Sequence, residues 1–202
     1  MIGIIDYGMG NLRSVHKAFL HLGFEAEIIK LPEELIKCDK IVLPGVGAFG
    51  DAIKTLKSSG MDEAIKSSTK KGTFFLGICL GMQLAFEESY EGGRFEGLSL
   101  MPGSITRLEP LDKTYKIPHM GWNSLIIRKR DPLFKSLSQA PFMYFDHAYC
   151  LKTDSDIASA DCEYGEVFQA AAQSENIFAT QFHPEKSGEE GLKILDAFGR
   201  LT

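Results

Sequence analysis

The sequence has few of the features that mark exported, membrane-bound or nucleic-acid-binding proteins. Its four cysteines form no C-x-x-C pair, which argues against a structural zinc site. The formal net charge is −5, so neither nucleic acid nor an anionic membrane should attract the chain at long range. No apolar run reaches the length that crosses a bilayer. We therefore expect no metal, no nucleic-acid partner and no membrane insertion.

Two further absences concern the N-terminal segment. MIGIIDYG lacks the charged region and the cleavage site of a signal peptide, so we expect a mature cytoplasmic protein with reduced thiols. The glycines that follow are similar to a dinucleotide-binding loop, but Arg13 stands where G-x-G-x-x-G needs its third glycine. We therefore expect no nucleotide site and no cofactor.

Apolar periodicity in the first 90 residues indicates alternating strands and helices. The 202 residues are 44% hydrophobic, enough for one domain, residues 1–202, with a full core. Strands are expected at 2–6, 26–31, 40–45 and 73–78, and helices at 11–22, 48–58, 61–70 and from about residue 80. This order predicts an α/β fold with a largely parallel central sheet and helices on both faces.

The alternation of strand and helix segments ends at about residue 90. Six apolar segments joined by short turns, from GLSLMPGSITRLE to IFATQFH, are typical of strands and predict an antiparallel or mixed extension of the sheet. The last segment has the apolar spacing of a helix. Ser187 and Glu190 have the spacing of a capping box, which we expect to begin that helix.

The segment GICLG places Cys79 between Gly77 and Gly81, where an apolar strand gives way to a helix. This is the pattern of a nucleophile elbow, a strained turn that projects its central side chain above the sheet edge. The start of a helix favours the thiolate, and the amide of Leu80 would form half of an oxyanion hole. By itself the pattern is equally compatible with a buried structural cysteine.

The segment FHPEKS supplies a candidate base and a group to orient it. His183 follows an apolar strand, and Glu185 lies two positions further on. In an extended backbone these two side chains project to the same side, so the carboxylate would hold one imidazole nitrogen and leave the other for the thiol. Pro184 should keep this segment out of helix.

The loop LPGVGAFG is a third element, in which Gly45 and Gly47 follow a buried strand. Such a loop can present backbone N–H groups to an anion. Neighbouring parallel strands would bring it beside Cys79, where it would supply the other half of the oxyanion hole. Alone, it would be an ordinary strand-to-helix turn.

Together these motifs resemble the class I (triad-type) glutamine amidotransferases over essentially the whole chain. GICLGMQ and FHPE are highly specific to that class. Further stretches resemble the glutaminase subunits of imidazole glycerol phosphate synthase in histidine biosynthesis: IDYGMGNLRSV, LPGVGAF, IPHMGWN, MYFDHAY and FHPEKS. The resemblance implies an enzyme with the class I glutamine amidotransferase fold.

The resemblance also implies roles for individual residues. The nucleophile, the general acid and base, and the orienting carboxylate would be Cys79, His183 and Glu185. The oxyanion hole, completed by a peptide flip when the partner engages, would be formed by Val46, Gly47 and Leu80. Glutamine would be bound by Gly45, Gln83, His147, Ala148 and Tyr149. The partner would dock near Asn11, His119, Gly121, Trp122 and Asn123.

The implied reaction is hydrolysis of L-glutamine to glutamate and ammonia through a cysteinyl thioester. The ammonia would pass through a closed channel into a (β/α)₈-barrel synthase subunit, with which the chain would form a heterodimer. That partner would act as the lyase that makes imidazole glycerol phosphate and an aminoimidazole carboxamide ribotide. The family usually has serine at the position of Ala148, so glutamine binding would be weaker here if that hydroxyl contributes.

Three alternatives remain open at this point. Related glutaminases serve anthranilate, aminodeoxychorismate or pyridoxal phosphate synthesis, or the amination of unusual sugars, and the last branch is the hardest to separate. A scaffold with a decayed active site is disfavoured because Cys79, His183 and Glu185 are all present. A generic α/β-hydrolase is disfavoured because its acid usually lies well before the histidine.

Overall fold

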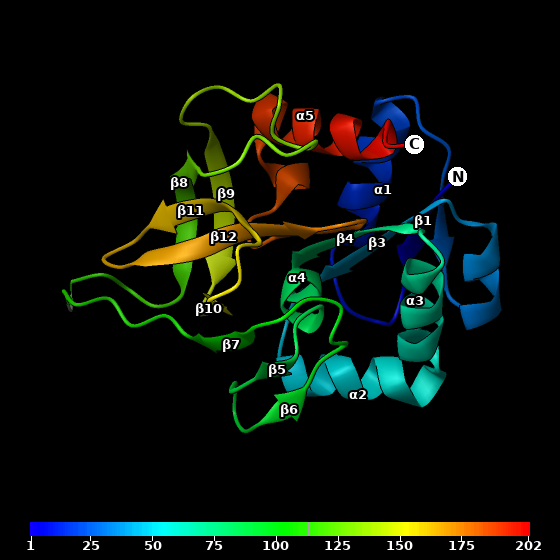
Figure 1. The fold of residues 1–202 in the computed structure, drawn as a ribbon, viewed down its shortest axis with the longest axis horizontal. Coiled ribbons are helices and arrows are strands. Elements are labelled where there is room, and N and C mark those ends of the chain that lie inside the picture. The colour runs from blue at the N-terminus through cyan, green and yellow to red at the C-terminus, as the bar shows by residue number, and fades with distance from the viewer. Residues whose placement is uncertain (113) are drawn as a thin grey trace.

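The computed structural model describes residues 1–112 and 114–202. Within these residues, 13 strands join in one sheet and helices cover both of its faces (Figure 1). The strands are β1 Ile2–Ile5, β2 Ala26–Ile29, β3 Lys40–Gly45, β4 Phe74–Cys79, β5 Glu88–Ser89, β6 Phe95–Glu96, β7 Ser104–Arg107, β8 His119–Ile127, β9 Phe142–His147, β10 Tyr149–Lys152, β11 Ala158–Glu163, β12 Val167–Ser174 and β13 Ile177–Thr180. The helices are α1 Leu12–His21, α2 Phe49–Ser59, α3 Met61–Lys70, α4 Leu80–Leu84 and α5 Gly188–Gly199, with 3₁₀ turns η1 Pro32–Lys37 and η2 Pro184–Lys186.

The core of the sheet is parallel and follows the order β2-β1-β3-β4-β13. Its strands are short apolar runs because both of their faces are covered. Side chains alternate between the two faces, so Ile4 and Val42 enter one buried cluster while Ile5 and Leu43 enter the other. The predicted parallel α/β core is confirmed.

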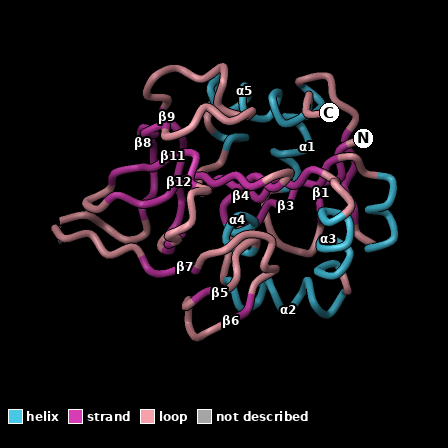
Figure 2. The backbone as a smooth tube through the Cα atoms, in the orientation of Figure 1, coloured by secondary structure: helices cyan, strands magenta, loops and turns pink. Residues whose placement is uncertain are grey.

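The sheet continues in an antiparallel direction beyond β13, through β12, β10 and β7, with β11, β8 and β9 branching from this path. Figure 2 shows these strands at one end of the molecule, away from both chain ends. The predicted mixed extension is therefore confirmed. One strand differs: β13, expected in the extension, pairs in parallel with β4 and completes the core.

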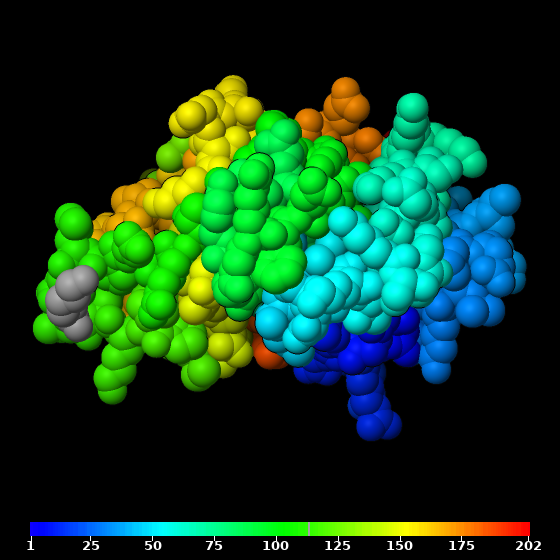
Figure 3. All heavy atoms as spheres, turned by 90° about the horizontal axis from the view of Figure 1, so that it is seen from below, coloured from blue at the N-terminus to red at the C-terminus, as the bar shows by residue number. Residues whose placement is uncertain are grey.

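Helices α1 and α5 pack on one face of the sheet, and α2 and α3 lie on the other (Figure 1). Seen from below, α2, α3 and the segment after α4 form the cyan and green middle of the visible face (Figure 3). Gly60 separates α2 from α3 with a left-handed backbone, φ +72°, which a glycine adopts at low cost. Helices α2 and α3 begin and end within one residue of the predicted bounds.

The predicted capping box at Ser187 is wrong. Its hydroxyl makes no capping bond to α5. Instead it donates to the His183 carbonyl at 2.6 Å and accepts from the Tyr144 amide at 3.0 Å. Glu190 likewise bonds Ser138 and Lys193 rather than the helix start. The serine thus ties η2 to β9, and this tie fixes the backbone of the candidate base.

Candidate active site

Cys79 lies at the sharp turn where β4 ends and α4 begins. Its φ is +55°, a conformation that residues other than glycine rarely adopt. The sulfur is thereby raised above the carboxyl edge of the parallel strands, where ligands of α/β sheets bind. The predicted strained turn between strand and helix is confirmed, and the role of Cys79 as nucleophile stays a prediction. Helix α4 is only five residues long, however, so its dipole favours a thiolate less than a longer helix would.

The two glycines that flank Cys79 are required by close backbone contacts. A Cβ on Gly77 would lie 2.5 Å from the Gly81 carbonyl oxygen. A Cβ on Gly81 would lie 1.7 Å from the carbonyl oxygen of Leu43 in β3. Both distances are far below contact distance, so the turn can form only with glycine at these positions.

The parallel pairing of β13 with β4 brings a distant part of the chain to the elbow. Thr180 is the register partner of Ile78, the residue before Cys79. The chain then runs three residues further to His183, whose Nδ1 lies 2.8 Å from the Glu185 carboxylate. Both side chains are only 2% exposed. Because a carboxylate accepts, Nδ1 carries the proton and Nε2 is left for the sulfur.

The local backbone here differs from the sequence-based prediction. Pro184–Lys186 forms the 3₁₀ turn η2, with Pro184 at its first position, rather than an extended segment. Proline is compatible with that position because its missing N–H would have no partner there. The carboxylate of Glu185 therefore contacts the imidazole across a tight turn. The predicted contact between the two side chains is present, but the predicted extended backbone is wrong.

The Cys79 sulfur has two polar neighbours besides the imidazole. It lies 3.7 Å from the Asp146 carbonyl oxygen, to which the thiol donates, and 3.8 Å from Nε2 of Gln181. Among the described residues, His183 Nε2 has no hydrogen-bond partner. Burial alone would lower the pKa of His183, but the nearby sulfur of Cys79 and carboxylate of Glu185 outweigh it and raise that pKa to about 10. The imidazole therefore readily takes the thiol proton.

The loop after β3 lies directly beside the elbow. Gly45 is the register partner of Cys79, and a Cβ on Gly45 would lie 2.9 Å from Cβ of Leu80. Gly47 has φ +104°, a conformation open to glycine. Val46 is exposed. Gly45 and Leu80 thus lie beside the elbow, and Val46 and Gly47 follow directly after Gly45 in the loop, so their oxyanion role stays a prediction.

Gln83, one turn of helix after the elbow, is buried with its amide directed at two partners. Its Nε2 donates to the Tyr149 carbonyl at 3.0 Å and to Oε1 of Gln181 at 3.1 Å. His147 also directs Nδ1 to the Tyr149 carbonyl, at 2.9 Å. The carbonyl of Ala148 accepts from Leu108 at 2.9 Å. The segment predicted to bind glutamine therefore joins the elbow helix through one shared carbonyl.

Comparisons with known proteins agree with this geometry. The family described as "Glutamine amidotransferase class-I" matches residues 3–200. The chain belongs to the class I glutamine amidotransferases. One curated relative of this amidotransferase is "Imidazole glycerol phosphate synthase subunit HisH" of Caldanaerobacter subterraneus subsp. tengcongensis. It is 50% identical over 202 residues, and the alignment covers 100% of this chain and 98% of the relative. "Imidazole glycerol phosphate synthase subunit HisH 1" of Campylobacter jejuni subsp. jejuni is 49% identical over 204 residues and is covered completely.

Solved structures of lower identity share the fold of this amidotransferase. A structure titled "PurLQS from Thermotoga maritima" has a TM-score of 0.76 at 20% identity and covers 98% of this chain and 96% of that one. A structure titled "putative gmp synthase subunit a protein" from Thermoplasma acidophilum has a TM-score of 0.73 at 21% identity, covering 98% and 91%. The predicted glutamine amidotransferase fold is thus confirmed.

Beyond the glutamine segment, two buried histidines form a pair. His119 Nδ1 lies 3.1 Å from His147 Nε2, and the His119 ring stacks between Phe145 and Tyr164. Burial lowers the pKa of His119 to about 4 and is also the main cause that lowers the pKa of His147 to about 3. Both rings are therefore neutral at pH 7. His119 is only 2% exposed, so its side chain lies beneath the surface near which the partner is expected to dock.

Two apolar side chains of the same strand, β8, are exposed beside this pair. Trp122 is 56% exposed and Met120 is 64% exposed. Trp122 packs edge-on against Tyr144, over whose ring the Lys186 ammonium lies at 5.4 Å. Lys186 belongs to η2, the turn that carries Glu185. The exposed patch of Met120 and Trp122 is therefore connected through Tyr144 and Lys186 to the turn beside the candidate base His183.

The remaining predicted docking residues lie at different places. Asn123 is half-buried and donates to the Glu163 carbonyl at 2.8 Å. Gly121 lies between the exposed Met120 and Trp122. Asn11 is exposed at the start of α1, where its side chain caps the helix by accepting from Ser14 at 3.3 Å.

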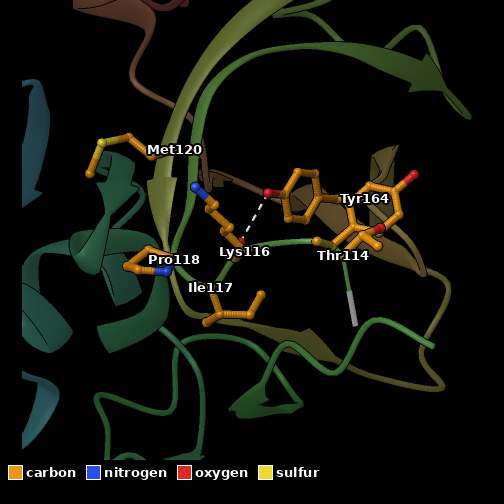
Figure 4. A pocket seen from close by; sticks show the side chains of 7 residues that line it. Thr114, Lys116, Ile117, Pro118, Met120 and Tyr164 are labelled. Carbon is orange, nitrogen blue, oxygen red and sulfur yellow. Dashed lines mark hydrogen bonds between the residues drawn. The ribbon is translucent and has the colours of Figure 1, made fainter. Parts of the chain in front are cut away.

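A hollow of about 580 Å³ borders the exposed patch. Its walls include Met120, Ile117, Lys116 and Tyr164, and the Tyr164 hydroxyl donates to the Lys116 carbonyl at 2.9 Å (Figure 4). Tyr164 is also the ring that stacks on His119. The hollow and the patch thus form one continuous, partly apolar face next to β8.

Sequence reasoning missed three residues at the elbow: Tyr7, Asp146 and Gln181. The Asp146 contribution is a backbone carbonyl, for which no sequence signal exists. Tyr7 places a buried hydroxyl against Gly45. Gln181 is a polar residue inside the apolar run IFATQF, and that interruption was an available signal.

Across residues 1–112 and 114–202, no group of His, Cys, Asp and Glu is arranged to hold a metal ion. In the same residues, none of the helices combines the length and apolar character that crossing a membrane requires.

Proposed function

We propose that this chain is the glutaminase subunit of an imidazole glycerol phosphate synthase in histidine biosynthesis. Relatives of about half identity over their full length bear that subunit name. The observation that carries the proposal is the convergence of Cys79 with the His183–Glu185 pair on neighbouring parallel strands. Four buried, free cysteines favour a reducing compartment, the cytoplasm.

The reaction proceeds in two halves at Cys79. The thiol proton moves to Nε2 of His183, and the sulfur attacks the side-chain amide carbon of glutamine. His183 then gives its proton to the departing nitrogen, so the C–N bond breaks and a glutamyl thioester and ammonia are left. Water, deprotonated by the same imidazole, attacks the thioester and releases glutamate and the thiol. Glu185 holds the imidazole in the required tautomer throughout.

Two backbone donors stabilise the oxyanion in this proposal. Leu80 supplies its amide at the start of α4, and the Val46–Gly47 peptide supplies the second. The support is that Gly45 is the register partner of Cys79. Gln83 and the backbone of His147, Ala148 and Tyr149 bind the amino and carboxylate groups of glutamine, which the buried contact between Gln83 and Tyr149 supports.

The ammonia is used by a (β/α)₈-barrel synthase subunit bound as a heterodimer. In open water ammonia becomes ammonium, which is not a nucleophile, so the product passes through a closed channel. The partner converts it into imidazole glycerol phosphate and an aminoimidazole carboxamide ribotide. It docks on the exposed patch of Met120 and Trp122, because large exposed apolar side chains of this kind are typical of interface centres.

The test is a glutamate-release assay of the chain with and without a candidate histidine-pathway barrel synthase and its nucleotide substrate. We expect very low activity for the chain alone and a large increase in the complex. Cys79→Ala should abolish that activity, whereas the matched variant Cys38→Ala, at another buried cysteine, should retain it. Activation by a sugar-aminating partner, and not by the barrel synthase, would overturn the assignment.

A further inference from the structure

Gln181 is a fully buried amide placed between the nucleophile and Gln83. It follows β13 and is 0% exposed, and its backbone amide donates to the Ala170 carbonyl at 2.8 Å. Its Oε1 accepts from Gln83 at 3.1 Å, and its Nε2 lies 3.8 Å from the Cys79 sulfur. Burying an amide is costly unless its polar atoms are paired. The pairing partners here are the nucleophile and the candidate glutamine-binding side chain.

The orientation of the Gln181 amide is fixed by a group that can only accept. The Tyr149 carbonyl requires Gln83 to present its NH₂ group, which also faces Gln181. Gln181 must therefore present Oε1 to Gln83, and its NH₂ group then faces the sulfur. The same carbonyl also accepts from Nδ1–H of His147. The Tyr149 carbonyl oxygen thus decides which group donates in the Gln83–Gln181 bond and in the Gln181–Cys79 bond.

We propose that Gln181 is a positioning residue that holds the Cys79 sulfur with an N–H donor and favours its thiolate form. This inference deepens the proposed glutaminase function and rests on it. A thiolate accepts hydrogen bonds more strongly than a thiol, so a fixed donor stabilises the reactive form. The Asp146 carbonyl, in contrast, can only accept and therefore favours the thiol. Gln181 and Asp146 thus act on the same sulfur in opposite directions.

The proposal is tested by the pH dependence of Cys79 alkylation with iodoacetamide, read by mass spectrometry of the Cys79 peptide. Gln181→Met removes the donor at similar length, and Gln181→Glu keeps an acceptor for Gln83 but introduces a group that ionises beside the sulfur. We expect the pH of half-maximal alkylation to rise in both variants, by about one unit for the methionine and more for the glutamate. The matched control is Gln169→Met, because Gln169 bonds Thr153 at both ends of its amide.

Steady-state kinetics of the reconstituted complex supply a second measurement. Gln181→Glu should lower kcat roughly tenfold or more, while KM for glutamine stays within about threefold, because the lost bond acts on the nucleophile. A Gln181→Met protein that unfolds like the wild type and alkylates with the wild-type pH profile would overturn the proposal. The alkylation needs neither glutamine nor partner, so it decides on Gln181 even if the wild-type complex releases no glutamate.

A measurement on the unaltered chain covers the case in which the variants do not fold. In ¹⁵N-labelled wild type, the side-chain NH₂ resonance of Gln181 should move with pH at the same midpoint as Cys79 alkylation. In Cys79→Ser the movement at that midpoint should disappear, because serine does not ionise in this range, and only movement caused by His183, which also faces the sulfur, should remain. A Gln181 resonance that ignores the ionisation of Cys79 would overturn the proposal.

Discussion

Gly45 and Cys79 are register partners across the parallel strands β3 and β4, so the candidate oxyanion loop and the candidate nucleophile leave the sheet side by side. The spacing at this edge is set by backbone atoms, since the Cβ that Gly81 lacks would lie 1.7 Å from the Leu43 carbonyl oxygen. The site is therefore built from rigid strands and depends on glycines that no other residue can replace.

Gly81→Ala should destabilise the protein because the backbone of β3 or α4 has to shift. We expect the free energy of unfolding to fall by about 3 kcal/mol in urea denaturation. Gly23→Ala is the control, because Gly23 has φ +83° but open space around its Cβ position, and only the backbone cost of about 1 kcal/mol applies. Equal losses in the two variants would contradict the steric explanation.

Tyr7→Phe should stabilise the chain. The Tyr7 hydroxyl is buried without a hydrogen-bond partner among the described residues, and burial followed by the charge of Cys79 raises its pKa above the ordinary value. Removing an unpaired buried hydroxyl should raise the free energy of unfolding by about 1 kcal/mol. The measurement is the urea midpoint at constant slope. A decrease would show instead that the hydroxyl has an acceptor in solution.

Stability should depend on pH through His183. Its pKa is about 10 in the folded chain against a reference of 6.5, so its contribution to stability is complete below about pH 6.5 and disappears as the pH rises toward 10. The difference in unfolding free energy between wild type and His183→Gln should therefore shrink from pH 7 to pH 10. Comparing the two proteins cancels the titration of groups distant from His183, so the difference reports on His183 together with its neighbours Cys79 and Glu185. A constant difference over that range would contradict the predicted charge state.

Trp122→Ala should weaken binding of the proposed barrel partner. An exposed tryptophan that becomes buried at an interface centre contributes about 2 kcal/mol or more, so the dissociation constant should rise at least about thirtyfold. Isothermal titration calorimetry with the purified partner measures it. Ile36→Ala, which truncates an exposed apolar residue on η1, is the control and should leave the affinity unchanged. Equal affinities of the two variants would place the interface elsewhere.

Much of the site follows from local sequence, because an elbow needs glycines at fixed positions and a strand needs a short apolar run. The positions of Cys79 and of the His183–Glu185 pair could therefore be predicted. The 3₁₀ turn at Pro184 and the role of Ser187 could not, since both depend on how η2 packs against β9. The burial of His119 depends on its cross-strand pairing with His147, which no local pattern contains.

The insertion of β13 beside β4 has a consequence for how the enzyme emerges from the ribosome. Residues 1–79 can form four neighbouring parallel strands early in synthesis, but β13, which leads to the candidate base His183, is about a hundred residues further on. Contacts of such long sequence separation form slowly and late. A nascent or truncated chain therefore displays a cysteine without its imidazole, and hydrolytic competence arises only when nearly the whole polypeptide has been made.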